Sequence, residues 1–152
     1  MPEEVERTGL VTFKGTPMTL VGEGVKVGDR APDFIVTDNA MQPAGLEAFR
    51  GKIKIISSVP SLDTPVCDME TRRFNQEAGD LPDKVVILTI SMDLPFAQKR
   101  WCGAAGIEKV KTLSDFKNHS FGCAYGVLIK ELKLLARAVF LVDDQDIVRY
   151  VE

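Results

Sequence analysis

Two apolar, β-branched segments constrain the fold of this chain more than any other feature. They are "KIKIISSV" (residues 52–59) and "KVVILTIS" (84–91). The second is apolar almost throughout, which is typical of a strand buried on both faces of a parallel sheet. The polar segment between them contains a helix-compatible run that starts near residue 67. Parallel strands need such a crossover, and it is nearly always right-handed. The sequence therefore predicts a β-α-β unit over residues 52–91.

The part of the chain before this unit predicts short β elements. Two apolar runs within residues 10–22 flank a Lys14–Gly15–Thr16 turn, which indicates an N-terminal hairpin. A short strand is expected at residues 34–37, because Pro32 favours an extended neighbour. Residues 38–51 are expected to form a polar connection.

A second helix is expected directly after the β-α-β unit. Asp93 suits the N-cap, and Pro95 suits the first turn. Gly103 or Gly106 is expected to end this helix.

The remaining segments predict one strand, a connection and then a two-stranded hairpin. "VKTLSD" (110–115) has the composition of a strand, and "FKNHSFGCAYGV" (116–127) is expected to be a glycine-punctuated connection. "RAVFLVD" (137–143) and "IVRYVE" (147–152) predict a C-terminal hairpin around an acidic turn.

This order of elements is that of a thioredoxin-like α/β fold with an added N-terminal hairpin. The length of 152 residues suits one domain, residues 1–152. A hydrophobic content of 45% is enough for a core without disulfide staples. Thioredoxin-like folds close with a C-terminal helix, and no such helix is expected here because the sequence stops on its last predicted strand.

The charge of the chain argues against two classes of partner. Its 19 basic and 22 acidic residues give a net charge of −3, whereas nucleic acids and anionic membranes favour a basic face. The apolar runs are much shorter than the ~20 residues of a membrane span. The N-terminus has no signal-peptide pattern, so the cytoplasm is the expected location.

The three cysteines, Cys67, Cys102 and Cys123, do not suit a disulfide framework. In a reducing compartment, a cysteine pair is more often catalytic, redox-sensing or metal-binding. Zinc is not favoured, because the chain has no C-x-x-C and His119 is its only histidine. We expect neither a metal nor a cofactor.

Cys67 lies where the first strand of the unit gives way to a helix, in "VPSLDTPVC" (59–67). Thr64 is a good N-cap and Pro65 suits the first helical position, which puts Cys67 in the first turn. Free N–H groups and the helix dipole there favour a thiolate. The alternative is that Cys67 is simply a small buried hydrophobic residue.

These residues resemble a known family. Pro60-x-x-x-Thr64-x-x-Cys67 is similar to the peroxidatic motif of peroxiredoxins, and "SLDTPVC" resembles their thiol peroxidase branch. The resemblance covers nearly the whole chain. It extends to four further segments, which are "VTFKGTPMTLVG", "VGDRAPDF", "SMDLPFAQKRWCG" and "LLARAVFLVD".

The resemblance implies a role for each of five residues. Cys67 would be the peroxidatic nucleophile, and its thiolate would attack a peroxide oxygen and become a sulfenic acid. Thr64 and Arg137 would orient the peroxide, and Pro60 would shield the sulfenic acid. Cys102 would resolve it by forming an intramolecular Cys67–Cys102 disulfide, which thioredoxin would reduce. Without the resemblance, Arg137 would be interpreted as a surface ion-pair residue and Cys102 as a small buried one.

A disulfide needs Cα atoms within about 7 Å, and cysteines on two separate helices are expected to start farther apart. We therefore expect the turn that holds Cys67 to unwind during the cycle. Cys123 is interpreted as a non-catalytic, packed or partly exposed thiol, and His119 as a loop or surface residue.

The function expected from the resemblance is a peroxidase for hydrogen peroxide and small organic hydroperoxides. Thioredoxin is the expected reductant, and a homodimer is the expected assembly. Two other functions would use the same cysteine pair. One is a general thiol–disulfide oxidoreductase, which the missing C-x-x-C disfavours. The other is a peroxide sensor that is oxidised once without turnover.

Overall fold

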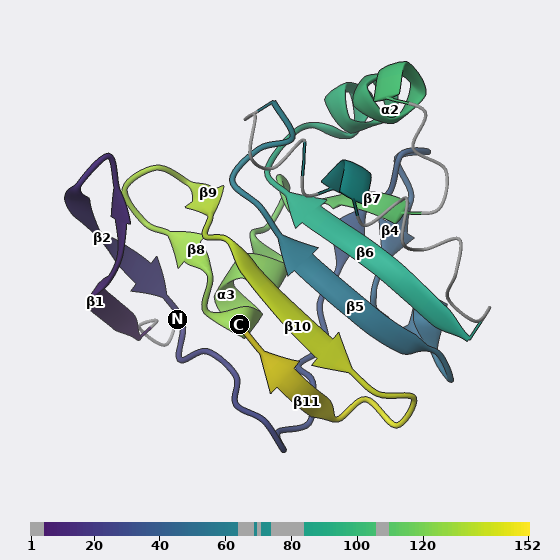
Figure 1. Ribbon diagram of the computed structural model, residues 1–152, viewed down its shortest axis with the longest axis horizontal. Helices are drawn as coiled ribbons and strands as arrows, with labels where there is room; N and C mark the ends of the chain where they lie inside the picture. Colours follow the sequence, from purple (N-terminus) through teal and green to yellow (C-terminus); the bar gives the residue numbers. More distant parts are fainter. Residues whose placement is uncertain (1–4, 64–68, 70, 74–83, 106–109) are drawn as a thin grey trace.

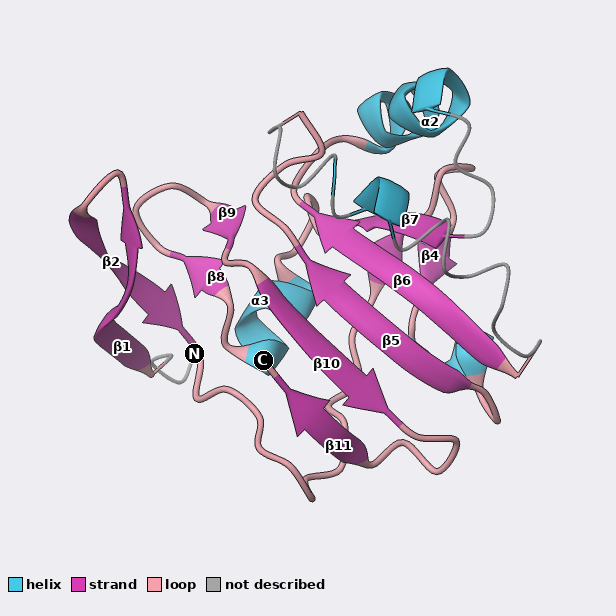
Figure 2. Ribbon diagram, viewed as in Figure 1, coloured by secondary structure: helices cyan, strands magenta, loops and turns pink. Residues whose placement is uncertain are grey.

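The computed structural model describes residues 5–63, 69, 71–73, 84–105 and 110–152 (Figure 1). Two sheets organise these residues. The larger sheet has seven strands in the order β11-β10-β5-β6-β7-β3-β4, and the smaller has four in the order β1-β2-β8-β9. Both appear in Figure 2, with few helices around them. None of the described helices has the length and apolarity that a membrane crossing requires.

The centre of the large sheet is the predicted parallel pair. β5 (Ile53–Ser58) and β6 (Val85–Ser91) run parallel, with Ile55 opposite Ile87. β6 is buried over nearly its whole length, as its apolar sequence predicts. β7 (Val110–Ser114) continues the parallel arrangement on the other side of β6. The arrowheads of β5 and β6 point to the same edge of the sheet (Figure 1), so their carboxyl ends meet there.

The edges of the large sheet are antiparallel. On one side β10 (Ala138–Val142) pairs with β5 and with β11 (Val148–Val151), which confirms the predicted C-terminal hairpin. On the other side β3 (Val36–Thr37) pairs with β7 and with β4 (Pro43–Ala44). β3 is shorter than the predicted 34–37 strand.

Two helices in the described residues occupy opposite faces of this sheet. α2 (Pro95–Ala105) places Trp101 and Cys102 against Ile55, Ile87 and Val110. α3 (Ser120–Tyr125) packs Phe121 and Tyr125 into the main core with Ile56 and Leu88. Because side chains alternate along a strand, Ile55 and Ile56 point to different faces, and so the two helices lie on different faces.

The small sheet begins with the predicted N-terminal hairpin. β1 (Glu6–Phe13) starts earlier than expected and pairs with β2 (Thr16–Val21). Lys14 and Gly15 both have positive φ, 51° and 82°, as a two-residue hairpin turn requires. β8 (Leu128–Ile129) and β9 (Leu134–Leu135) complete the sheet, and β8 pairs with β2.

Two sequence predictions about elements are wrong. Residues 116–127 are not a plain connection, because α3 lies within them. Of the two glycines expected to end the second helix, Gly103 lies inside α2, which is described to Ala105, and Gly106 lies outside the described residues. The segment 38–51 contains β4 and a short 3-10 helix, η1 (Leu46–Phe49), as well as connecting residues. These short elements leave little periodic signal in the sequence.

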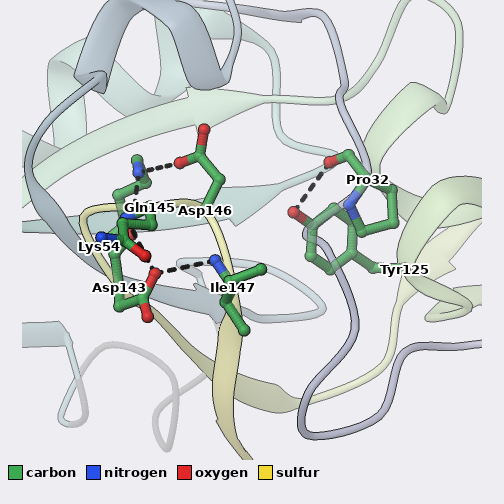
Figure 3. A network of polar contacts seen from close by, with 7 residues as sticks. All are labelled: Pro32, Lys54, Tyr125, Asp143, Gln145, Asp146 and Ile147. Atoms are coloured by element: carbon green, nitrogen blue, oxygen red, sulfur yellow. Dashed lines mark hydrogen bonds and ion pairs between the residues drawn. The ribbon is translucent and has the colours of Figure 1, made fainter.

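Polar contacts anchor the C-terminal hairpin and the aromatic core (Figure 3). Lys54 on β5 is fully buried and forms an ion pair with Asp146 in the β10–β11 turn. Asp143 accepts backbone hydrogen bonds from Gln145 and Ile147 within the same turn. The Tyr125 hydroxyl donates to the Pro32 carbonyl at 2.9 Å, which ties α3 to the segment before β3.

Candidate active site

The five residues that the sequence singles out divide into three described and two undescribed ones. Pro60, Cys102 and Arg137 lie within the described residues, whereas Thr64 and Cys67 lie outside them. Pro60 follows β5 and is half-buried, and Arg137 precedes β10 and is exposed. Cys102 is half-buried on α2.

The pairing of β5 with β10 brings Pro60 and Arg137 to one end of the sheet. Ala138 and Ser58 form the last pair of the antiparallel register, and Arg137 and Val59 are the next residues of the two chains beyond it. The buried Ser58 hydroxyl donates to the carbonyl of Ala136 at 2.7 Å, which fixes the two chain ends together. Arg137 is therefore at the start of the segment that leads from β5 towards Cys67.

Asp93 fixes the segment that follows Pro60. Its carboxylate accepts hydrogen bonds from the Ser61 hydroxyl at 2.7 Å and from the Leu62 backbone N–H at 2.8 Å. It also accepts one from the Ser91 hydroxyl at the end of β6, at 2.8 Å. These bonds join the chain after β5 to the chain after β6. The carboxylate does not have the expected N-cap role, because Ser61, Leu62 and Ser91, from which it accepts, all lie outside α2.

Gln98 extends this polar network into α2. Its side chain is 1% exposed and donates from Nε2 to the Ser91 hydroxyl and the Leu113 carbonyl, at 2.9 and 2.8 Å. The Ser114 hydroxyl donates to the backbone carbonyl of Asp93. The carboxyl ends of β6 and β7 are thus tied to the start of α2, the helix that carries Cys102.

Trp101 connects Cys102's helix with the segment before Cys67. Trp101 packs against the Val59–Leu62 cluster and also against the cluster that contains Ile87 and Val110. The guanidinium of Arg72, from the helical residues 71–73, lies 5.8 Å from the ring centroid. This distance suits a cation–π contact.

Cys102 itself is a free thiol beside a polar side chain. Its Sγ lies 3.3 Å from Oγ1 of Thr112 on β7, and the Thr112 hydroxyl donates to Oδ1 of Asn39 at 3.2 Å. These residues also line a surface cleft of about 660 Å³ beside β7. Cys102 therefore has both a hydrogen-bonding neighbour and a route to solvent.

The third cysteine lies in a different part of the molecule. Cys123 is on α3, half-buried against the main core, and lines a cavity with His119 and Lys133. His119 is the residue before α3 and has a left-handed conformation, with φ at 53°. Cys123 is thus packed and partly exposed, as expected.

Sequence reasoning missed the supporting residues Asp93, Gln98, Thr112 and Asn39. Asp93 carries a signal, because it is an acid placed directly after a buried strand, but its partners lie some thirty residues earlier. Thr112 and Asn39 carry no signal of their own. Their relation to Cys102 depends on the packing of α2 on β7 and on the position of the loop before β4.

Comparisons with known proteins extend over most of the chain. The family described as Redoxin matches residues 26–152. A protein of Halalkalibacterium halodurans named thiol peroxidase is 60% identical over 142 residues, which cover 93% of this chain and 85% of that protein. A thiol peroxidase of Bacillus subtilis is also 60% identical over 142 residues, covering 93% and 84%.

A solved structure supports the same relationship. The crystal structure of a peroxiredoxin-like protein from Aquifex aeolicus superimposes with a TM-score of 0.87 at 43% sequence identity. The match covers 99% of this chain and 87% of that one. The thioredoxin-like fold expected from the order of elements is thereby confirmed.

Proposed function

The chain belongs to the redoxin family and is a peroxiredoxin-type thiol peroxidase, and we propose that Cys67 is its peroxidatic nucleophile and Cys102 its resolving cysteine. Hydrogen peroxide and small organic hydroperoxides are the proposed substrates. Thioredoxin is the proposed reductant. No metal or cofactor is needed, because the substrate is the oxidant and the two thiols carry the electrons.

One observation carries the assignment of the site. The β5–β10 register brings Arg137 beside the chain that runs through Pro60 towards Cys67. A guanidinium at this place supplies a permanent positive charge and several N–H donors. Such donors stabilise charge that develops on an oxygen during reaction. This supports a role for Arg137, together with Thr64, in orienting the peroxide.

The first half of the cycle oxidises Cys67. Its thiolate attacks one peroxide oxygen, an S–O bond forms and the O–O bond breaks. The leaving oxygen departs with the electron pair of that bond and takes up a proton, which gives water or an alcohol. Cys67 is left as a sulfenic acid, two electrons more oxidised. Pro60 shields the sulfenic acid from further reaction.

The second half of the cycle returns Cys67 to the thiol. The Cys102 thiolate attacks the Cys67 sulfur, an S–S bond forms and hydroxide leaves as water. Thioredoxin then supplies two electrons and two protons to reopen the disulfide. Because the two Cα atoms must come within about 7 Å, we propose that the turn holding Cys67 unwinds. Identical backbones in the reduced and disulfide forms would contradict this unwinding.

The remaining proposals concern the setting of the enzyme. We propose that residues 1–152 form one domain, and that the enzyme acts in the cytoplasm without nucleic-acid or membrane partners. A homodimer is proposed on the resemblance and on the exposed apolar side chains of Leu94 and Phe96, which are 52% and 69% exposed beside the site. Sedimentation of the protein at micromolar concentration tests the dimer, and a monomer there would argue against it.

Replacing the two cysteines separately tests the assigned roles. Cys67→Ser should abolish peroxide consumption. Cys102→Ser should consume one equivalent of peroxide per chain, gain one oxygen atom in mass, and then stop turning over with thioredoxin. Cys123→Ser is the matched control and should retain full turnover, because Cys123 lies on α3 in the core cluster away from α2.

Two outcomes would overturn the assignment. Full turnover by the Cys67 variant would remove its role as nucleophile. A Cys102 variant that fails to consume even the first equivalent would show that Cys102 acts earlier than resolution. Peroxide consumption is followed directly, and thioredoxin oxidation is followed through the NADPH of thioredoxin reductase.

A further inference from the structure

Cys102 ends a row of hydroxyl side chains that crosses the large sheet. Ser57 on β5 lies opposite Thr89 on β6, and Thr89 lies opposite Thr112 on β7. Each follows by two residues a member of the apolar row Ile55, Ile87 and Val110, so the hydroxyls share the face covered by α2. All three are at most 3% exposed. Thr112 is the member of the row whose hydroxyl meets the Cys102 sulfur.

The Thr112 hydroxyl contacts both Asn39 and the Cys102 sulfur. A threonine hydroxyl has one hydrogen to donate and lone pairs with which to accept. Its hydrogen points to Oδ1 of Asn39, at 3.2 Å. The contact with Cys102 at 3.3 Å can be donated from either side, and while the Thr112 hydrogen is used for Asn39 it is the thiol that donates. In that arrangement a chain of hydrogen bonds runs from sulfur to hydroxyl to amide.

This chain of groups can also serve the thiolate. If the Cys102 proton leaves, the Thr112 hydroxyl can turn and donate its hydrogen to the sulfur. The side-chain amide of Asn39 carries both an acceptor and a donor, so it can then donate from Nδ2 to the Thr112 oxygen. Each protonation state of Cys102 thus keeps two hydrogen bonds, and hydrogen bonds to a charged partner are the stronger ones.

We propose that Thr112 and Asn39 are positioning residues that orient the Cys102 sulfur and reverse their hydrogen bonds as it passes from thiol to thiolate. The proposal rests on the proposed function in so far as Cys102 is the resolving cysteine, since a resolving attack requires its thiolate. We call the hydrogen-bonded chain Cys102–Thr112–Asn39 the relay. The relay depends on the contacts of Cys102 and not on which cysteine forms a disulfide with it.

The cleft beside β7 supplies the route by which the proton leaves. Asn39, Cys102 and Thr112 line it together, and it is open to solvent. The charged groups that line the same cleft are Asp38, Lys52 and Lys111. Asp38 uses its Oδ1 to hold the backbone N–H groups of Ala40 and Gln42, which fixes the loop that carries Asn39.

Alkylation of Cys102 as the sole thiol tests the relay without any catalytic turnover. In the Cys67→Ser/Cys123→Ser background, the rate of reaction with iodoacetamide is measured across pH. Thr112→Val keeps the β-branched shape but removes the hydroxyl, so the thiolate loses its donor. The rate at neutral pH should fall about tenfold, and the pH profile should differ from that of the parent. Thr112→Ser should restore the parent profile.

Thr89→Val is the matched control. It removes a buried hydroxyl from the neighbouring position of the same row, where the described residues offer that hydroxyl no hydrogen-bond partner. Its alkylation profile should match that of the parent. A Thr112→Val profile that coincides with the Thr89→Val profile would overturn the relay, and so would a Thr112→Ser variant that behaves like Thr112→Val.

A second measurement separates failure of the relay from failure of the proposed function. In the otherwise unchanged protein, Thr112→Val should form the Cys67–Cys102 disulfide about tenfold more slowly after one equivalent of peroxide. The consumption of that equivalent should keep its rate. An altered alkylation profile combined with full turnover by Cys102→Ser would refute the resolving role and leave the relay intact. Single turnover by Cys102→Ser with an unchanged Thr112→Val profile would refute the relay alone.

Discussion

Asp93 shows how a single side chain joins two segments that the chemistry needs together. One oxygen of its carboxylate holds Ser61, and the other holds the Leu62 backbone and Ser91. Ser61 and Leu62 lie between Pro60 and the undescribed residues that begin at 64. Asp93 also directly precedes the turn into α2, which carries Cys102. The Asp93 carboxylate therefore accepts three hydrogen bonds where the segment after β5 meets the segment after β6.

Asp93→Asn should weaken this junction. An amide offers one acceptor oxygen in place of two, so at least one donor among Ser61, Leu62 and Ser91 loses its partner. We expect a loss of about 1–3 kcal/mol in the free energy of unfolding. The rate of the first reaction with peroxide should also fall, because the segment leading to Cys67 loses its anchor. Urea unfolding and stopped-flow peroxide consumption measure the two effects.

Asp63→Asn is the control for Asp93→Asn. Asp63 is an exposed acid in the same segment, and its backbone N–H donates to the Ser61 hydroxyl. Its substitution should leave unfolding free energy within about 0.5 kcal/mol of the parent. Equal effects from the two substitutions would mean that local charge, and not the anchoring geometry, explains the result.

At the residue scale, the sequence singles out candidate reacting groups but not their supports. Cys67, Pro60, Thr64, Cys102 and Arg137 come from motifs and from the resemblance, and their roles stay predictions. Asp93 is predicted as an N-cap, which is a local role, but its partners are distant. The contact of Thr112 with Cys102 requires the packing of α2 on β7, which no local pattern encodes.

At the element scale, the turn between β10 and β11 is held by a buried ion pair. The side chain of Lys54 is 0% exposed, and that of its partner Asp146 is 25% exposed. Asp146 has a left-handed backbone with φ at 62°, and its carbonyl accepts the N–H of Ala31. Figure 3 shows the lysine reaching from β5 to this turn. The pair thus ties the C-terminal hairpin to the central strand.

Removing the two members of this pair should have unequal effects. Asp146→Asn leaves the ammonium of Lys54 buried without its counter-charge, which costs about 3–5 kcal/mol in the free energy of unfolding. Asparagine tolerates the left-handed backbone, so strain does not add to this. Lys54→Met should cost less, because the carboxylate left behind reaches water. The double variant should be more stable than Asp146→Asn alone. Urea unfolding of the three variants measures these differences.

Lys84 and Asp144 form the matched surface pair for this comparison. They lie 2.7 Å apart, with side chains 56% and 39% exposed. Lys84→Met should change the unfolding free energy by at most about 1 kcal/mol. A Lys54→Met variant as unstable as Asp146→Asn would contradict the argument from burial.

The elements that sequence patterns predict are those whose signal lies within the element. β5, β6 and the β10–β11 hairpin have long apolar or alternating runs, and the Lys14–Gly15 turn marks the β1–β2 hairpin. α3 has six residues with a glycine inside, and its first backbone N–H groups are held by Asp115, which lies outside it. β8 and β9 have two residues each and exist only through pairing with β2 and with each other. Such elements follow from tertiary contacts.

At the scale of the whole molecule, Asp115 links the end of β7 in the large sheet to α3 in the main core. It follows β7, and its backbone N–H donates to the Ser91 carbonyl on β6. Its carboxylate accepts the backbone N–H groups of Phe121 and Gly122 at 3.0 and 2.7 Å, which holds α3 against the core. The side chain is 1% exposed, and burial raises the pKa of this carboxyl above its ordinary 3.8, although the backbone hydrogen bonds oppose the shift.

A raised pKa makes stability depend on pH in a definite direction. Between 3.8 and the higher folded pKa, the folded protein binds the proton while the unfolded chain has lost it. Stability from this group is therefore greatest at low pH, and it falls as pH rises through the folded pKa. Asp115→Asn does not titrate, so its pH dependence lacks this contribution.

We therefore expect the stability difference between the parent and Asp115→Asn to shrink as pH rises. The variant should be about 1–3 kcal/mol less stable at the acid end, because both oxygens of the protonated carboxyl can still accept from the two N–H groups of α3, whereas an amide offers only one acceptor. The difference should decrease towards neutral pH, where the parent bears the cost of a buried charge. Urea unfolding of both proteins from just above pH 3.8 to neutrality measures it.

Glu47→Gln separates this effect from general changes in surface charge. The Glu47 side chain is 81% exposed on η1, where it pairs with Arg50. Its removal should leave the difference from the parent nearly constant over the same pH range. If the Asp115→Asn difference instead grows with pH, the carboxylate is stabilised by α3 more than it is penalised by burial. In that case the hydrogen bonds from the backbone N–H groups of α3 outweigh desolvation, and they lower the pKa of the Asp115 carboxyl more than burial raises it.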